Sequence, residues 1–204
     1  QLALANKTRL VVGGDDVTSK GLAMLNTGGS PLNDALVEST GANTRIEAVQ
    51  LDGGTGGSCD TAAQNFDLIR ISGASPSEIV NVEGRAARSN GLRLSPADAP
   101  NEVRDSWLHH NCASGVQANG VILTRNVIEL SGRRLSNNQL LFDEAVGILG
   151  DAASEIGTNA NLIRNHASFG IDVQHVLPLT LENDAVCGNG STGIAISGTS
   201  SSQT

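Results

Sequence analysis

The sequence predicts an all-β fold, a parallel β-helix in which short coils stack into a solenoid, and three observations support this. A glycine followed by an aliphatic residue recurs at a nearly constant interval. Between these glycines lie short stretches in which apolar and polar residues alternate, as in β-strands. The 204 residues include 24 glycines but only three Phe, one Trp and no Tyr, so small and aliphatic side chains must fill the core.

The recurring glycines set the length of the predicted coil. They stand at positions 91, 115, 147, 170 and 193, at intervals of 24, 32, 23 and 23 residues. A helical repeat would need some thirty residues and a different apolar period. The spacing therefore predicts coils of about 23 residues, with an insertion or an extra strand between Asn119 and Arg134 in the long interval.

Four copies of a longer pattern can be aligned around these glycines, over 105–118, 137–150, 159–173 and 183–196. Each copy has an Asn or Asp, an aliphatic residue three positions later, a second Asn or Asp, and then the glycine. Stacking would place the second polar residues in a ladder of hydrogen-bonded side chains, made of Asn111, Asp143, Asn165 and Asn189. Two aliphatic rows would then fill the core, Leu108, Leu140, Leu162 and Val186 in one and Val116, Ile148, Ile171 and Ile194 in the other.

The chain divides into three parts on this reading. Residues 44–198 carry the solenoid, with the weaker alternating stretches 46–51, 68–71 and 79–82 at its start. Residues 1–43 do not repeat and contain two glycine-rich turns, so we expect an irregular N-terminal coil or cap that covers the open end of the sheets. The serine-rich segment 199–204 is expected to be a disordered tail.

The run from Asp105 to Ile196 resembles the repeats of right-handed parallel β-helix proteins of the pectin-lyase-like superfamily, with the form N-x-I-x-x-N-x(3,4)-G-I-x-I. The resemblance implies a right-handed solenoid, a secreted or cell-surface location, and a uronate-rich polysaccharide or cell-surface glycan as partner. Enzymes of this superfamily act as lyases, often with Ca²⁺, or as hydrolases with several Asp residues. Neither complete motif is present in this sequence.

Composition narrows the classes of function. A formal net charge of −8 and only two lysines argue against a nucleic-acid partner, which needs a basic surface. No apolar run approaches the length of a membrane span. The N-terminus starts at Gln1 without a signal-peptide pattern, which indicates a processed or excised chain. Cys59, Cys112 and Cys187 form no metal-binding pair, and their spacing leaves open one disulfide with a free thiol.

Stacking of the predicted coils places a set of polar side chains on one face. Glu144 and His166 would be neighbours, with Arg164 beside them, and this trio is the candidate catalytic set. His109, His110 and Asp172 are candidate binding residues near it. A carboxylate, an imidazole and a guanidinium could bind an acidic sugar or transfer a proton. The alternative is that these residues only solvate the turns of the solenoid.

The sequence leaves two functions open. One is an extracellular β-helix that binds or processes an anionic polysaccharide, with enzymatic activity undecided. The other is a non-catalytic structural, adhesin or surface module, for which self-association is possible. Ca²⁺ is a conceivable cofactor because Asp15, Asp16, Asp52 and Asp60 lie in turns, but they lack the spacing of a calcium loop. No metal site is predicted.

Overall fold

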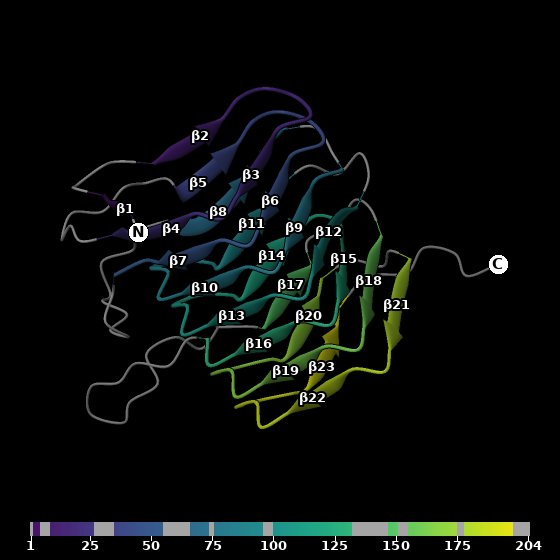
Figure 1. The fold of residues 1–204 in the computed structure, drawn as a ribbon. Helices are drawn as coiled ribbons and strands as arrows, with labels where there is room; N and C mark the ends of the chain where they lie inside the picture. The colour runs from purple at the N-terminus through teal and green to yellow at the C-terminus, as the bar shows by residue number, and fades with distance from the viewer. Residues whose placement is uncertain are drawn as a thin grey trace.

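The computed structural model describes residues 2–4, 9–26, 35–54, 66–73, 76–95, 100–131, 147–150, 155–174 and 178–197. All regular structure in these ranges is β-strand, and the strands form three parallel sheets that run the length of the molecule (Figure 1). We call the three sheets A, B and C. Along the chain each coil adds one strand to sheet B, then one to sheet C, then one to sheet A. The all-β parallel solenoid predicted from the sequence is therefore confirmed at this level. The described residues contain no helix that is long and apolar enough to cross a membrane.

The three sheets are continuous stacks of short strands. Sheet A contains β1 (Leu2–Leu4), β4 (Ala23–Asn26), β7 (Gln50–Asp52), β10 (Glu83–Arg85), β13 (Trp107–His109), β16 (Val127–Glu129), β19 (Leu162–Arg164) and β22 (Ala185–Cys187). Sheet B contains β2 (Leu10–Val12), β5 (Ala35–Ser39), β8 (Asp67–Ile71), β11 (Leu92–Leu94), β14 (Val116–Ala118), β17 (Ile148–Gly150), β20 (Ile171–Val173) and β23 (Ile194–Ile196). Sheet C contains β3 (Thr18–Lys20), β6 (Arg45–Glu47), β9 (Glu78–Val80), β12 (Asn101–Arg104), β15 (Val121–Thr124), β18 (Ile156–Asn159) and β21 (Leu179–Glu182).

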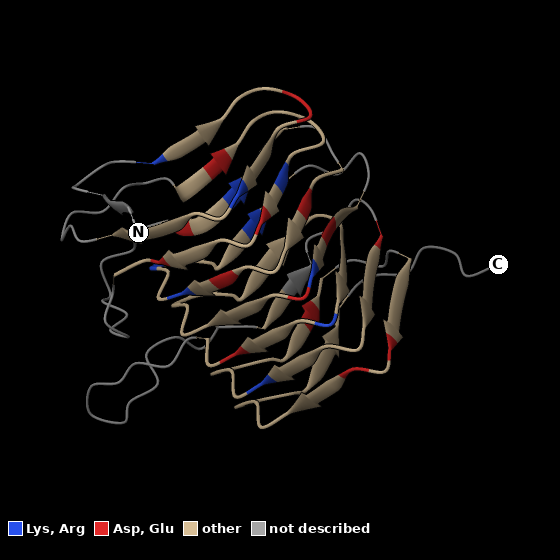
Figure 2. Ribbon diagram, in the orientation of Figure 1, with Lys and Arg blue, Asp and Glu red and all other residues tan. Residues whose placement is uncertain are grey.

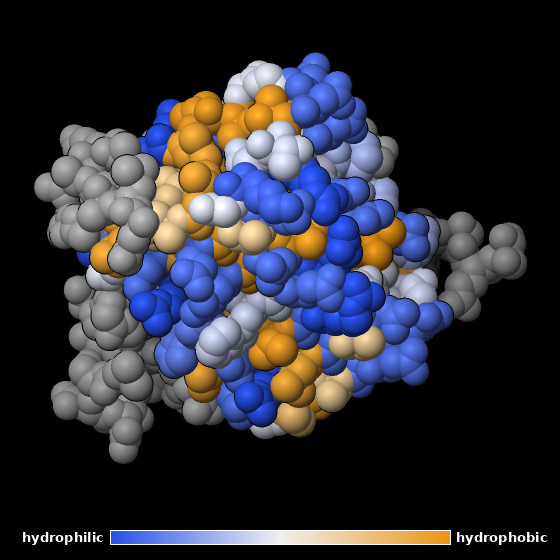
Figure 3. Space-filling view, in the orientation of Figure 1, coloured by the Kyte–Doolittle hydropathy of each residue, from blue (hydrophilic) through white to orange (hydrophobic). Residues whose placement is uncertain are grey.

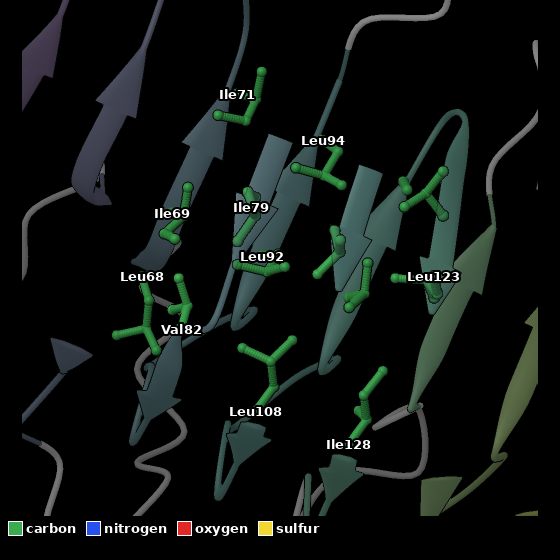
Figure 4. Close-up of a cluster of buried hydrophobic side chains, with 14 of the residues drawn as sticks. Leu68, Ile69, Ile71, Ile79, Val82, Leu92, Leu94, Leu108, Leu123 and Ile128 are labelled. Carbon is green, nitrogen blue, oxygen red and sulfur yellow. The ribbon is translucent and has the colours of Figure 1, made fainter. Parts of the chain in front are cut away.

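The core is a column of aliphatic side chains that point inward from all three sheets. Figure 4 shows members of this column from neighbouring coils, including Leu92, Leu108 and Ile128. Each of these three side chains is fully buried. Because every coil supplies its own inward residues, the column needs few aromatic side chains, and Phe66 is the single aromatic residue among the large, fully buried side chains of the described chain.

The register of sheet B confirms the glycine-based alignment. Val116 pairs with Ile148, Ile148 with Ile171, and Ile171 with Ile194, as the repeat predicted. The glycines before these strands pack closely. A Cβ on Gly170 would lie 2.6 Å from the carbonyl oxygen of Gly193. Glycine recurs at this position because the next coil's backbone occupies the space of a side chain.

The predicted alignment of sheet A was wrong. Leu108 pairs with Ile128, Ile128 with Ile163, and Ile163 with Val186, so Ile163 and not Leu162 is the buried residue. The insertion or extra strand expected between Asn119 and Arg134 does not occur in the described part of that range, because β15 and β16 are regular strands of the stack. The extra residues of the long interval follow Ser131, and Leu140 and Asp143 lie outside the described residues.

The described parts of the N-terminal segment 1–43 contribute strands to the three sheets, where an irregular coil or cap was expected. Leu10 of β2 pairs with Val37 of β5, and Thr18 of β3 pairs with Arg45 of β6. Ala23 of β4 pairs with Gln50 of β7 in sheet A. These strands lack the Asn and Gly signals of the later coils but keep the alternation that the sheets require. The tail 199–204 lies outside the described residues.

The corners between sheets hold the polar ladders. From sheet C to sheet A the corner has two residues, and the first adopts a left-handed conformation, as at Asn81 (φ 53°) and Asn183 (φ 55°). The second residue points inward and bonds to the adjacent coil. These second residues are Ser106, Asn126, Asn161 and Asp184 in the later coils.

A second ladder lies at the corner between sheets A and B. Asn111 accepts a hydrogen bond from the amide of Ala87, and Asn189 accepts one from the amide of His166. His166 itself stands in this ladder. Asn165, which the sequence placed there, precedes the ladder and has φ 59°.

Candidate functional site

The outer face of sheet A carries the densest group of chemically useful side chains. In its three-residue strands the middle residue points into the core, so the residues on either side point outward. The outward residues form two rows, and successive residues within a row are about 4.8 Å apart because they lie on neighbouring strands. One row is Ala23, Gln50, Glu83, Trp107, Val127, Leu162 and Ala185, and the other is Leu25, Asp52, Arg85, His109, Glu129, Arg164 and Cys187.

Trp107 is the centre of this face. Its side chain is 43% exposed, and its ring stacks on that of His109, with centroids 4.1 Å apart and an interplanar angle of 22°. The indole Nε1–H donates a hydrogen bond of 2.9 Å to Glu129 Oε1. One ring face and one edge of the indole are therefore fixed by the protein. A large aromatic surface held in this way is ready to contact a ligand.

Ion pairs fix the two guanidinium groups of the face. Arg164 Nε donates to Glu129 Oε2 at 2.7 Å, and Arg85 pairs with Asp52 through Nε and Nη2 at 3.0 and 2.9 Å. Burial acts to raise the pKa of Glu129, but the hydrogen bonds from Arg164 and Trp107 outweigh it and the pKa is lowered. Glu129 is therefore an anion at neutral pH. Figure 2 shows acidic and basic positions interspersed along the coils.

His109 lies under Trp107 in a confined position. The residue is 5% exposed, and its Nε2 lies 3.6 Å from Glu83 Oε1, beyond hydrogen-bond length. Its Nδ1 is 2.8 Å from Nδ1 of His110. Burial lowers the pKa of His109 and the charge of His110 lowers it further, whereas Glu83 and Glu129 act in the opposite direction. His109 is thus held as a neutral ring at neutral pH.

Two adjoining hollows lie beside Trp107. One has a volume of about 420 Å³ and extends from Gly21 to Trp107 across the corner between sheets C and A. The other, of about 270 Å³, lies over β4, β7 and β10 and is bordered by Asp52 and Arg85. Both are lined by Ala23, Gln50 and Glu83, so together they form one groove along the outer face of sheet A. The face in Figure 3 is mostly hydrophilic, with smaller apolar areas between.

The structure brings together only part of the predicted site. Arg164 and His109 lie in the same outward row of sheet A, and His110 contacts His109 from the adjoining corner. Asp172 lies on the outer face of sheet B, paired in register with Leu149 and Ala195, and so belongs to a different face. Glu144 lies outside the described residues. A catalytic role for Glu144 and Arg164 stays a prediction.

His166 is placed in the interior. It is fully buried, its Nδ1 accepts a hydrogen bond from the amide of Ser131 at 3.2 Å, and its Nε2 lies 3.0 Å from the carbonyl oxygen of Ile128. Both ring nitrogens are thereby engaged by backbone groups, which fixes a neutral ring with the proton on Nε2. This arrangement supports a ladder role for His166 and offers no ring atom to a ligand.

Four residues on the outer face of sheet A were not identified from the sequence as candidates for the site: Glu83, Arg85, Trp107 and Glu129. The alternation in Trp107-Leu108-His109 contained the signal, because Leu108 in the core requires both neighbours to face outward. The sequence instead led us to expect that Trp107 points inward or caps an insertion. Glu129 was missed because its strand was taken as part of an insertion.

Among the described residues, the aspartates considered for Ca²⁺ and the cysteines lie apart from the groove or have other partners. Asp15 and Asp16 accept hydrogen bonds from the adjacent coil, and Asp52 pairs with Arg85. Within the described ranges there is no group of three or more side chains that could hold a metal ion. Cys112 is disulfide-bonded, Cys187 is an exposed free thiol, and Cys59 and Asp60 lie outside the described residues.

Comparison with protein families, curated proteins and solved structures finds no match to this chain.

The ion pair between Arg164 and Glu129 leads to a prediction about stability. We expect Arg164→Met to lower the free energy of unfolding by about 1 kcal/mol at neutral pH, because half-exposed pairs contribute little more. The pKa of Glu129 is lowered in the folded state, so its contribution is present above its unfolded value and is lost as the pH falls through the folded value.

Urea unfolding of the variant and the wild type at about pH 7 and about pH 3 checks this expectation. The difference between them should disappear at the lower pH. Arg93→Met on the outer face of sheet B is the control, since the described residues include no acidic partner for Arg93. A deficit that is the same at both pH values would contradict the assignment to the ion pair.

Proposed function

We propose that this chain binds an anionic polysaccharide along the outer face of sheet A, with Trp107 as the stacking surface. The observation that carries the proposal is the fixed, 43% exposed indole at the wall of a groove lined by Gln50 and Glu83. Sugar rings present apolar faces that stack on aromatic side chains, while carboxylates accept hydrogen bonds from hydroxyls and amide groups both donate and accept them. Such a groove suits an extended chain that runs along the solenoid axis.

The two guanidinium groups favour an anionic ligand. Arg85 lies in β10 and Arg164 in β19, on opposite sides of Trp107 in the stack. A guanidinium has five N–H donors, and the described contacts engage two nitrogens of Arg85 and one of Arg164. Donors therefore remain for uronate carboxylates, which guanidinium groups bind strongly. Binding is favoured over cleavage because His166 is buried and Arg164 is held by Glu129.

The handedness of the solenoid and the length of its coils are part of the same proposal. We infer a right-handed β-helix with coils of about 23 residues, similar to the pectin-lyase-like superfamily. A secreted or cell-surface location would expose the groove to such polysaccharides. The regular coils and the resemblance of residues 105–196 support this inference.

The test measures binding of oligogalacturonate, alginate oligomers and a neutral cello-oligosaccharide by calorimetry. We expect the acidic oligomers to bind more tightly than the neutral one. Trp107→Ala should weaken binding about tenfold, or about 1.4 kcal/mol, because it removes the stacking surface. Arg85→Ala should reduce the preference for acidic oligomers, whereas the matched control Arg93→Ala on sheet B should not.

The same samples are assayed for new reducing ends and for unsaturated uronate absorbance, with and without Ca²⁺. Cleavage lost in Arg164→Ala would extend the proposal to an enzyme. No binding to any oligomer would overturn it and favour a non-catalytic structural solenoid. Binding that is unchanged in Trp107→Ala would place the site on another face.

A further inference from the structure

The contact between His109 and His110 can hold only one proton between its two nitrogens. The Nδ1 atoms are 2.8 Å apart, so one must carry hydrogen and the other must accept it. The negative charge of Glu83 Oε1, 3.6 Å from the other nitrogen of His109, favours the tautomer with the proton on Nε2 of that ring. His109 therefore accepts at Nδ1, and His110 donates its Nδ1–H.

Protonation of each ring has a different effect on this contact. A proton on Nε2 of His110 leaves the hydrogen bond intact, because Nδ1–H of His110 still donates. A proton added to His109 must go to Nδ1, and two N–H groups would then face each other at 2.8 Å. That arrangement is repulsive, so protonation of His109 breaks the contact.

The charged groups around His109 determine which contact replaces its hydrogen bond to His110. Glu83 of β10 faces its Nε2, Glu129 of β16 is its register neighbour on one side, and Arg85 of β10 is its neighbour on the other. Arg85 is paired with Asp52, and Glu129 with Arg164 and Trp107. Glu83 accepts a 3.3 Å hydrogen bond from Gln50 and is the least firmly held of these carboxylates. An imidazolium at His109 would draw Glu83 toward it.

We propose that His109 and His110 form a proton-operated latch beneath Trp107, which keeps His109 neutral and bonded to His110 at neutral pH and releases it to pair with Glu83 in acid. On protonation of His109 the bond to His110 breaks, and Glu83 Oε1, which lies 3.6 Å from Nε2 of His109 in the neutral state, closes onto the imidazolium. The groove then gains a positive charge while the charge of Glu83 is compensated, so the site binds an acidic oligosaccharide more tightly. The last step rests on the proposed function, whereas the latch itself does not.

The burial of His109 sets the direction of the pH dependence. Burial lowers the pKa of His109, so the unfolded chain takes up a proton at a higher pH than the folded chain does. The latch is therefore closed above the ordinary histidine value of about 6.5 and opens only at lower pH. The folded state loses stability as the pH falls from that value toward the lowered one.

The latch is tested without any ligand, because Trp107 is the only tryptophan in the chain. An imidazolium stacked on an indole quenches its fluorescence, and the two rings are 4.1 Å apart. Titration of the full chain from about pH 8 to about pH 4.5 should show a loss of fluorescence with a midpoint below about 6.5. His109→Gln should abolish this transition, and His175→Gln should leave it unchanged.

His110→Gln separates a proton latch from simple packing. The glutamine amide can donate to neutral His109 and can accept from protonated His109, so the proton conflict is removed. The transition should therefore move to higher pH. A wild-type protein without a transition, a transition that persists in His109→Gln, or a midpoint that does not rise in His110→Gln would each overturn the latch. Circular dichroism confirms that each variant is folded.

A second titration measures the affinity for oligogalacturonate over the same pH range. Affinity that rises as the pH falls through the fluorescence midpoint in the wild type, and does not do so in His109→Gln, supports control of the site. Affinity that ignores the fluorescence transition overturns that control. If the oligomer does not bind at any pH, the proposed function fails, while the fluorescence titration still decides the latch.

Discussion

Replacing Gly170 by alanine is expected to lower the free energy of unfolding by about 2–3 kcal/mol, as for other overpacked interiors. A Cβ at this position would lie 2.5 Å from Val186 Cγ1, 2.6 Å from the carbonyl oxygen of Gly193 and 2.7 Å from Asn189 Nδ2. Two of these three atoms belong to the backbone or to a ladder side chain, which cannot move without disturbing the next coil. Chemical denaturation of the variant and the wild type measures the difference.

Gly193→Ala is the matched control because it changes the equivalent residue one coil later. There the nearest atom to a new Cβ is Val186 Cγ1 at 3.6 Å, an ordinary contact. Alanine should be neutral at this position, or stabilising by a few tenths of a kcal/mol through the unfolded chain. Equal losses in the two variants would show that the close approach between coils is not what requires glycine.

The same close approach explains why sheet B could be predicted from the sequence. Glycine is required at positions 91, 115, 147 and 170 by contact with the next coil, so its recurrence marks the coil directly. The residue after each glycine then has to begin a strand of sheet B. The pairs Val116 with Ile148 and Ile148 with Ile171 follow from that constraint alone.

Sheet A was harder to predict because no single residue type is required in its corners. The inward corner position is filled by Val82, Ser106, Asn126, Asn161 and Asp184 in successive coils. Serine, asparagine and aspartate can all accept the amide hydrogen of the previous coil. The segment Asn137 to Asp143 imitates the pattern, so the true strand at Val127–Glu129 was overlooked. A one-residue shift then placed Leu162 in the core in place of Ile163.

The candidate site was predicted in part for the same reason. Arg164 and His109 were selected, and both face outward from sheet A. His166 was assigned to a surface position because Asn165 was taken as the ladder residue. Trp107 and Glu129, which give this face much of its chemistry, come from β13 and β16. These strands are adjacent in the stack between β10 and β19, and only the correct register brings the two residues together.

Asn161→Ala is expected to lower the free energy of unfolding by about 3–4 kcal/mol, since it leaves several buried polar groups without partners. Asn161 is 2% exposed, and its Oδ1 accepts hydrogen bonds from the amide and from Nδ2 of Asn126. Its Nδ2 donates to the carbonyl oxygen of Leu123 and to Asp184 Oδ1. One side chain therefore joins three successive coils, and alanine removes all four bonds.

Two further variants separate the ladder role of Asn161 from the volume of its side chain. Asn159→Ala, at an exposed residue of β18, should change stability by less than about 0.5 kcal/mol. Asn161→Asp keeps the size and the acceptor but removes the donor and places a second carboxylate beside Asp184. At neutral pH it should therefore destabilise the chain as much as alanine does, because both the lost donor and the repulsion of like charges act against folding. In acid, protonation of one carboxylate supplies a hydrogen that the other can accept, so part of the loss should be recovered. An aspartate variant as stable as the wild type at neutral pH would show that the amide donor does not hold the coils together, and the cost in Asn161→Ala would then have to come from the cavity alone.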